Sequence, residues 1–150
     1  MIEDLTSVEY DALLRRDFAF FVARCFHDLN PQAELATNWH HEVIAAKLAA
    51  VQQGKIRRLI INLPPRHLKS LMASVAFPAW CLGHDPSAQI LCVSYAQDLS
   101  DKFARDCRSI MIGPWYRRSL RPAWLRNAWP CRSSSPPGKA TGSPPRPAAC

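Results

Sequence analysis

A lysine and a serine stand side by side in the middle of this chain, directly after a short basic loop. Residues 63–70 read LPPRHLKS and lie between an apolar run and a run with helical periodicity. A phosphate-binding loop needs backbone N–H groups converging at a helix start, a lysine for the outer phosphates and a hydroxyl for Mg²⁺. Lys69 and Ser70 have the right types and positions, so this stretch predicts a site for nucleotide phosphates.

The same loop departs from the usual phosphate-loop pattern. That pattern places glycines at the positions of Leu63 and Leu68, and neither is present. Pro64 and Pro65 have no backbone N–H to donate. A Cβ at position 68 costs free energy if the backbone there has a positive φ. On the pattern alone, the alternative is a strand-to-helix connection whose basic residues face solvent.

Two apolar runs rich in branched residues are predicted to position this loop. Residues 57–63 (RRLIINL) come directly before it, and residues 90–95 (ILCVSY) follow after a turn. Both runs lack polar alternation, which is typical of strands buried on both faces of a parallel sheet. Ligands of open parallel sheets bind outside the carboxyl ends of the strands, and the loop follows such an end.

Helical periodicity covers most of the remaining sequence up to residue 118. Thr6 and Glu9 fit a capping box that begins a helix over residues 7–29. Further helices are predicted over residues 39–53, ended by Gly54, and over residues 69–82 and 97–111. The residues expected on their buried faces are Phe18, Phe21, Val22, Cys25, Phe26, Ile44, Leu48, Val51, Leu71, Met72, Val75, Ala79, Leu99, Phe103, Cys107 and Ile110.

The order strand, helix, strand, helix predicts an α/β fold with a parallel sheet and right-handed crossovers. Composition then changes near residue 118. Residues 1–118 contain 14 Lys and Arg against 12 Asp and Glu, whereas residues 119–150 contain 5 Lys and Arg, no acid and 7 of the 13 prolines. Three regions are expected: an N-terminal helical segment (1–35), a domain around the loop (36–118) and a disordered tail (119–150).

Composition also bears on compartment and on metal binding. No apolar stretch approaches the roughly 18 residues that a membrane-spanning helix needs. The acidic N-terminus does not resemble a signal peptide, so a cytoplasmic protein is expected. The six cysteines show no CxxC spacing. Four of them lie in apolar stretches and are expected to be small core residues in a reducing compartment. Cys81 and His84 could form half of a metal site, but no second half is visible.

The stretch from Asn38 to Met111 resembles the N-terminal ATPase region of bacteriophage and prophage large terminase subunits. It begins NWHHE, continues through RRLIINLPPRHLKS and ILCVSYAQDL, and ends RDCRSIM, and the likeness covers about residues 36–118. The family's loop commonly reads PPRH-Gly-Lys-Ser, and this chain has Leu68 at the glycine. The resemblance implies an incomplete P-loop ATPase core that binds ATP and Mg²⁺.

The resemblance also implies a setting for the chain. Members of this family are motors that hydrolyse ATP to drive double-stranded DNA into procapsids in the cytoplasm of a bacterial host. The expected partners are therefore double-stranded DNA, the small terminase subunit and the portal protein, with a homo-oligomeric ring when the motor is intact.

Roles for individual residues follow from the resemblance by position. Lys69 would contact the β- and γ-phosphates, and Ser70 would bind Mg²⁺. Arg66 is a candidate for stabilising negative charge during hydrolysis, the alternative being a solvent-facing or phosphate-steering arginine. His67 is expected to have a structural role. The loop expected around the nucleotide comprises Pro65, Arg66, His67, Leu68, Lys69 and Ser70.

Two further segments match positions that contact ligands in the family. NWHHE lies where the family has an adenine-contacting segment, so Trp39 could stack on the base and His40 could hydrogen-bond to it. The alternative places Trp39 in the core and His40 and His41 at a helix start. Ser94 and Tyr95 lie in a segment that is near nucleic acid in related motors, where they could meet the DNA backbone.

Other parts of such an ATPase are missing from this sequence. Hydrolysis needs a second metal-side carboxylate at a strand end and a glutamate that activates water. No apolar run ends in paired acids, because Asp98, Asp101 and Asp106 fall on a predicted helix and no acid follows them. The family's nuclease domain is also absent. The chain is therefore expected to bind ATP weakly and to hydrolyse it poorly or not at all.

The change in composition after residue 118 allows two explanations. A frameshift, in the gene or in its sequencing, could have replaced the native continuation with an arbitrary Pro/Arg/Ser sequence. Alternatively, the tail is a basic arm that binds DNA phosphates. Two other functions stay open for the whole chain: a non-enzymatic remnant that does not bind ATP, and another helicase-like DNA-dependent ATPase.

Overall fold

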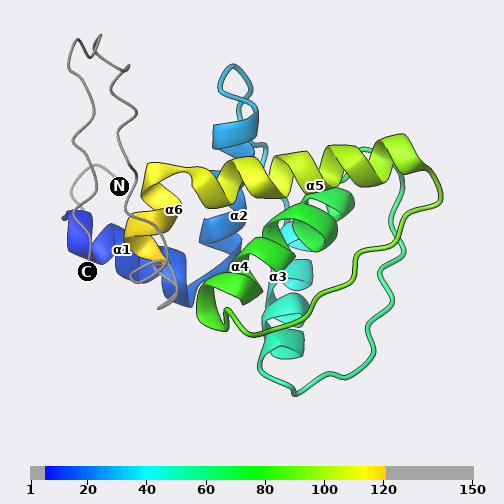
Figure 1. Cartoon of the computed structure of the whole chain (residues 1–150), viewed down its shortest axis with the longest axis horizontal. Coiled ribbons are helices and arrows are strands. Elements are labelled where there is room, and N and C mark those ends of the chain that lie inside the picture. Colours follow the sequence, from blue (N-terminus) through cyan, green and yellow to red (C-terminus); the bar gives the residue numbers. More distant parts are fainter. Residues whose placement is uncertain (1–5, 121–150) are drawn as a thin grey trace, which may run out of the picture.

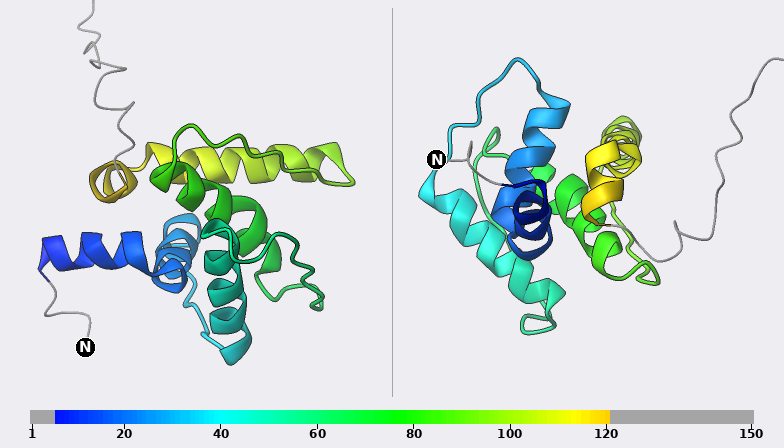
Figure 2. Two further views of the ribbon diagram at one scale, coloured as in Figure 1. Left: turned by 90° about the horizontal axis from the view of Figure 1, so that it is seen from below. Right: turned by 90° about the vertical axis from the view of Figure 1, so that its left-hand side faces the viewer.

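The computed structural model describes residues 6–120, and all the regular secondary structure within them is helical (Figure 1). The elements are α1 (Ser7–Arg16), α2 (Phe18–Leu29), α3 (Trp39–Gln52), the π-helical segment η1 (Leu71–Ala76), α4 (Phe77–His84), α5 (Gln97–Ile112) and α6 (Pro114–Ser119). α2 and the rod formed by η1 and α4 lie between α3 on one side and α5 on the other (Figure 2). α6 turns back from α5 to pack against α1.

The predicted α/β fold with a parallel sheet is wrong for the described part of the chain. Residues 57–63 and 90–95 are extended, but neither pairs with another strand between residues 6 and 120. A strand buried on both faces needs neighbours that take up its N–H and C=O groups. The helices build the core instead, and both segments pass over its surface as long connections (Figure 1).

Neither extended segment has the burial on both faces that the sequence pattern predicted. In the first, Leu59, Ile61 and Leu63 are partly buried against the core, whereas Ile60 is 93% exposed. This alternation is that of an extended chain with one face on the protein. In the second, Leu91 and Val93 are 88% and 85% exposed, so that segment is mostly outside the core.

The predicted helix over residues 7–29 exists, but it is divided at Asp17. The capping box at its start is confirmed, because the Glu9 N–H donates to Thr6 Oγ1 and the Thr6 N–H donates to the Glu9 carboxylate. Asp17 is the N-cap of α2 and accepts from the N–H groups of Ala19 and Phe20. An aspartate before an apolar run is a helix-start signal, and it begins a second helix here.

The helical run after the loop contains a π-helical segment where Pro78 enters it. Pro78 has no N–H, and its ring would collide with the carbonyl four residues earlier in an α-helix. The Phe77 N–H donates to Met72 O, five residues back, which widens the helix at this point. The π-turn thus accommodates the proline within a helix that continues through the core.

The core is built around aromatic side chains from several helices. Phe18 packs on Trp80 with ring centroids 5.0 Å apart, and Phe21 packs on Trp115 at 5.7 Å. The buried Tyr116 hydroxyl donates to Ala79 O at 2.7 Å, and burial raises the pKa of this phenol. Trp115 and Tyr116 belong to α6, which the sequence pattern did not predict.

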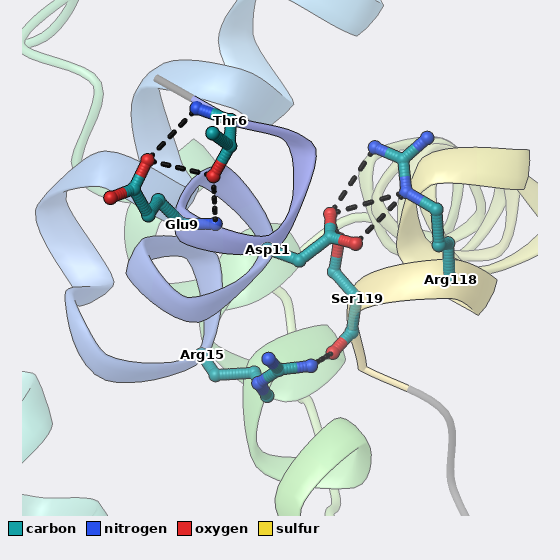
Figure 3. A network of polar contacts seen from close by, with 6 residues as sticks. All are labelled: Thr6, Glu9, Asp11, Arg15, Arg118 and Ser119. Carbon is teal, nitrogen blue, oxygen red and sulfur yellow. Dashed lines mark hydrogen bonds and ion pairs between the residues drawn. The ribbon is translucent and has the colours of Figure 1, made fainter.

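A polar network ties the two ends of the described chain together (Figure 3). Asp11 of α1 is buried and accepts hydrogen bonds from Arg118 Nε at 2.9 Å and from Ser119 Oγ at 2.6 Å. Arg15 Nη1 donates to Ser119 O at 2.9 Å. Ser119 and Leu120 are buried, so the packed structure continues past residue 118. The rest of the tail for which disorder is predicted, residues 121–150, lies outside the described residues.

No helix between residues 6 and 120 is both long enough and apolar enough to cross a membrane.

Candidate phosphate-binding site

The LPPRHLKS loop ends the long connection from α3 and leads into a helical run. Lys69 and Ser70 already have helical geometry, and the Met72 N–H donates to Leu68 O at 2.9 Å. The N–H groups of residues 69–71 come before this first helical hydrogen bond, so they have no partner within the helix, as at any helix start. Lys69 Nζ donates to Leu63 O at 2.9 Å, so the ammonium group closes the loop onto its own beginning.

The loop backbone is left-handed at two residues that are not glycine. Arg66 has φ +66° and Leu68 has φ +56°. Left-handed residues alternating with right-handed ones turn successive N–H groups toward a common side, which makes a concavity suited to anions. Each such conformation costs a non-glycine residue about 1–2 kcal/mol. Leu68 is the position at which the expected pattern has glycine, and its backbone has the conformation that glycine favours.

The side chain of Leu68 explains how the chain tolerates this backbone. Leu68 is half-buried and packs against the core. Its side chain lines a mainly apolar cavity of about 220 Å³, together with Phe20 of α2 and Met72 of η1. Apolar burial here offsets part of the cost of the positive φ. The leucine therefore anchors the loop to the helices where the family's glycine has no side chain.

Imidazole rings from α3 and from the loop meet beside the phosphate-loop sequence. The ring centroids of His40 and His67 are 5.3 Å apart, and those of His40 and His41 are 4.1 Å apart. His67 Nδ1 is 3.0 Å from Pro65 O within the loop. The predicted base-contacting segment and the predicted phosphate loop are thus neighbours in space, although about 25 residues separate them in the sequence.

Within this cluster, His41 has a lowered pKa. Burial lowers the pKa of its imidazole, and the nearby His40 and His67 lower it further. Its Nδ1 accepts a hydrogen bond from the Asn38 N–H at 3.3 Å. The sequence pattern predicts a ligand contact for His40 and gives His41 only a structural place at a helix start, and α3 does start at Trp39.

The remaining predicted site residues lie around this centre. Pro65, Arg66 and Ser70 are exposed, so the cation and the hydroxyl are accessible to a ligand. Trp39 is 73% exposed, which places it at the surface and not in the core, and its ring is edge-on to that of His40 at 6.0 Å. A flat exposed indole beside His40 is available for stacking.

A metal ion would find few protein ligands here. Within residues 6–120 there is no group of three or more His, Cys, Asp or Glu side chains able to hold a metal ion. Ser70 supplies one hydroxyl, and Mg²⁺ prefers carboxylate and phosphate oxygens. Asp101 accepts a hydrogen bond from Gln97, and Asp106 pairs with Lys102, so both serve α5 itself. The residues present fit the phosphates of a nucleotide better than they fit its metal ion.

Two other sequence-derived sites can be placed. Tyr95 is 96% exposed in the connection between α4 and α5, and Ser94 lines a separate cavity of about 300 Å³ beside α5.

His84 has Nδ1 2.8 Å from Trp80 O and Nε2 2.9 Å from Arg15 O. Both of its nitrogens face backbone carbonyls, so His84 links α4 to α1 and has no free nitrogen for a metal shared with Cys81.

Comparison with known proteins adds no relative: no family model, no curated protein and no solved structure matches this chain.

Proposed function

We propose that residues 63–70 bind the phosphates of ATP and that the chain derives from a DNA-packaging motor of the large-terminase type. The observation that carries the proposal is the form of the loop. It is left-handed at the glycine position, closed by Lys69 on Leu63 O, and followed at once by a helix start. Helix starts favour anions through their free N–H groups and the helix dipole, and left-handed residues in the preceding loop can turn further N–H groups toward the same anion.

The proposal rests on this loop and on the sequence resemblance, and it does not require a sheet. Lys69 and Arg66 supply positive charge within four residues, and Lys69 would exchange its carbonyl contact for a phosphate oxygen. His40 lies beside the loop, with its ring centroid 5.3 Å from that of His67, and Trp39 lies beside His40, so both are candidates to meet the base of the same nucleotide.

Hydrolysis is expected to be slow or absent. A bound Mg²⁺ would neutralise phosphate charge, with Ser70 as its ligand from the loop. Phosphoryl transfer also needs a group that positions the attacking water and a second metal-side carboxylate. The candidates on α5, Asp101 and Asp106, make side-chain contacts within that helix. Binding without efficient turnover is therefore the activity proposed for this chain.

The test is a titration of the protein with ATP, with and without Mg²⁺, by calorimetry. Lys69→Ala is expected to weaken binding about tenfold or more, because the residue makes a charge-assisted contact with phosphate. Lys47→Ala is the matched control, since Lys47 is exposed on α3 and its removal changes net charge equally. Equal loss in both variants, or no binding by the unmodified protein, would refute the proposal.

The proposed macromolecular partners need a separate measurement. Double-stranded DNA, the small terminase subunit, the portal protein and assembly into a ring are carried over from the family resemblance alone. A helicase-like ATPase of another kind would share the loop but not those partners. Co-purification of this chain with a portal or small subunit encoded beside it would favour the terminase assignment over that alternative.

A further inference from the structure

Three of the five histidines in the chain gather against the proposed phosphate loop. His40 and His41 come from the first turn of α3, and His67 comes from the loop itself. The centroid distances of 4.1 Å between His40 and His41 and 5.3 Å between His40 and His67 make one continuous cluster. No step of the proposed phosphate contact uses all three rings.

One nitrogen of this cluster has no hydrogen-bond partner among the described residues. His40 Nε2 is buried at the level of the atom and is not hydrogen-bonded. His41 uses Nδ1 to accept from the Asn38 N–H, and His67 Nδ1 is at hydrogen-bond distance from Pro65 O. A buried polar nitrogen without a partner is costly, so its presence on a ring next to two further imidazoles calls for a function.

The charged groups around the cluster come from three parts of the chain. Arg66 and Lys69 lie in the loop beside His67. Asp17, at the start of α2, and Glu42 of α3 line the same cavity as His41. A bound anion would therefore enter a region where the three rings have cations on the loop side and carboxylates on the cavity side.

We propose that His40, His41 and His67 form a proton-responsive cluster that strengthens nucleotide binding at the loop as the rings become protonated. This inference rests on the proposed binding of nucleotide phosphates. Imidazole is the side chain that changes charge near neutral pH, so such a cluster links binding to pH under physiological conditions.

The direction of the linkage follows from charge. Without ligand, burial and the neighbouring rings lower the pKa of His41, which favours its neutral form near pH 7. A bound triphosphate places several negative charges beside the rings and favours their protonated forms. Binding must then take up protons from solution, and affinity must fall as the pH rises.

The experiment measures proton uptake directly. ATP and inorganic triphosphate are each titrated into the full chain at pH 6.5, in two buffers with different ionisation enthalpies. The difference in heat gives the number of protons taken up per ligand bound. The variants are the triple substitution His40→Gln, His41→Gln, His67→Gln and the control His27→Gln, which alters an exposed histidine at the end of α2. Protons on the ligand itself contribute equally in all proteins and cancel in the comparison.

The expected result is greater proton uptake by the unmodified protein and by His27→Gln than by the triple variant. Affinity of the first two should fall roughly three- to tenfold between pH 6 and pH 8, with a clearly smaller fall in the triple variant. Binding with equal proton uptake in all three proteins would overturn this inference and leave the proposed function intact. Absence of any binding by the unmodified protein would overturn both.

A second measurement guards against misfolding of the triple variant. The histidine ring resonances of the unmodified protein are followed by NMR during a pH titration, with and without triphosphate. Three of the five should titrate at higher pH when the ligand is present, and the other two should not move. Equal titration curves with and without bound ligand would contradict the cluster's role without recourse to any variant.

Discussion

Leu68 combines a strained backbone with a favourable side chain. Its φ of +56° is a conformation that glycine adopts freely and that leucine adopts at a cost, while its side chain is held between α2 and η1. The sequence pattern alone marks this residue as a defect in a phosphate loop. In the structure, Leu68 makes two opposing contributions to the stability of the fold: its backbone conformation costs free energy and its side-chain packing gains it. Substitutions can separate the two.

Replacement of Leu68 by alanine and by glycine should separate them. Both variants lose the packing of the side chain, but only glycine relieves the left-handed backbone. At an ordinary position glycine is less stable than alanine by roughly 0.5–1 kcal/mol. Here we expect Leu68→Gly to be more stable than Leu68→Ala by about 1 kcal/mol. The free energy of unfolding from urea titration checks this, and the opposite order would mean that the backbone at 68 is not left-handed.

The site residues also indicate what sequence can predict at this scale. Lys69 and Ser70 are predicted phosphate-site residues because their types and spacing match those that contact phosphate and Mg²⁺. The contact between His40 and His67 was not predictable, because it depends on how the start of α3 meets a loop about 25 residues away. The sequence placed His41 at a helix start, and its burial beside two imidazoles appears only in the folded structure.

At the scale of elements, the helices were predictable where local signals were complete. The Thr6–Glu9 capping box and the glycine at position 54, with φ +73°, correctly marked a start and an end. The apolar periodicity continues across Asp17 and predicts one long helix, although the Asp17 side chain caps α2. The short α6 was missed because its stability comes from burial of Trp115 and Tyr116 and not from its own length.

The contact between α1 and α6 gives a prediction about pH. Burial tends to raise the pKa of Asp11, but hydrogen bonds from Arg118 and Ser119 outweigh it and the pKa is lowered. A lowered folded-state pKa stabilises the protein above the unfolded value of about 3.9, and this contribution disappears as the pH falls through the folded value. Asp11→Asn should therefore cost about 1–3 kcal/mol at pH 7.

The difference between Asp11→Asn and the unmodified protein should shrink as the pH is lowered from about 5 toward 2. Thermal or urea unfolding across this range measures it. Glu34→Gln, at an exposed position between α2 and α3, is the control and should change stability little at any pH. A constant difference between Asp11→Asn and the unmodified protein at all pH values would show that the carboxylate charge does not join α1 to α6.

At the scale of the whole molecule, the predicted sheet and the observed helical core differ for one physical reason. An apolar run of six or seven residues predicts burial, but it does not say which partner provides it. Between residues 6 and 120 no second strand pairs with either run, and the helices bury their own aromatic faces against each other. The periodicity of the helices was therefore informative, whereas the strand assignment depended on neighbours that the sequence could not specify.

The exposed apolar side chains of the two extended segments should govern association of the whole protein. Ile60, Leu91 and Val93 are each at least 85% exposed on backbone without strand partners, which is the combination that favours intermolecular pairing. The triple substitution Ile60→Lys, Leu91→Lys, Val93→Lys should reduce concentration-dependent association in sedimentation velocity while leaving the unfolding temperature nearly unchanged. These side chains contribute little to the core, so their loss should not destabilise it.

A matched control separates this effect from a simple increase in net charge. Val8, Val43 and Ile112 are also exposed apolar residues, but they lie on helices whose backbone hydrogen bonds are internal. Changing these three to lysine adds the same charge and should leave association closer to that of the unmodified protein. If both triple variants suppress association equally, charge repulsion and not the unpaired extended backbone controls it. A difference between them would identify the two extended segments as the surface through which copies of the chain meet.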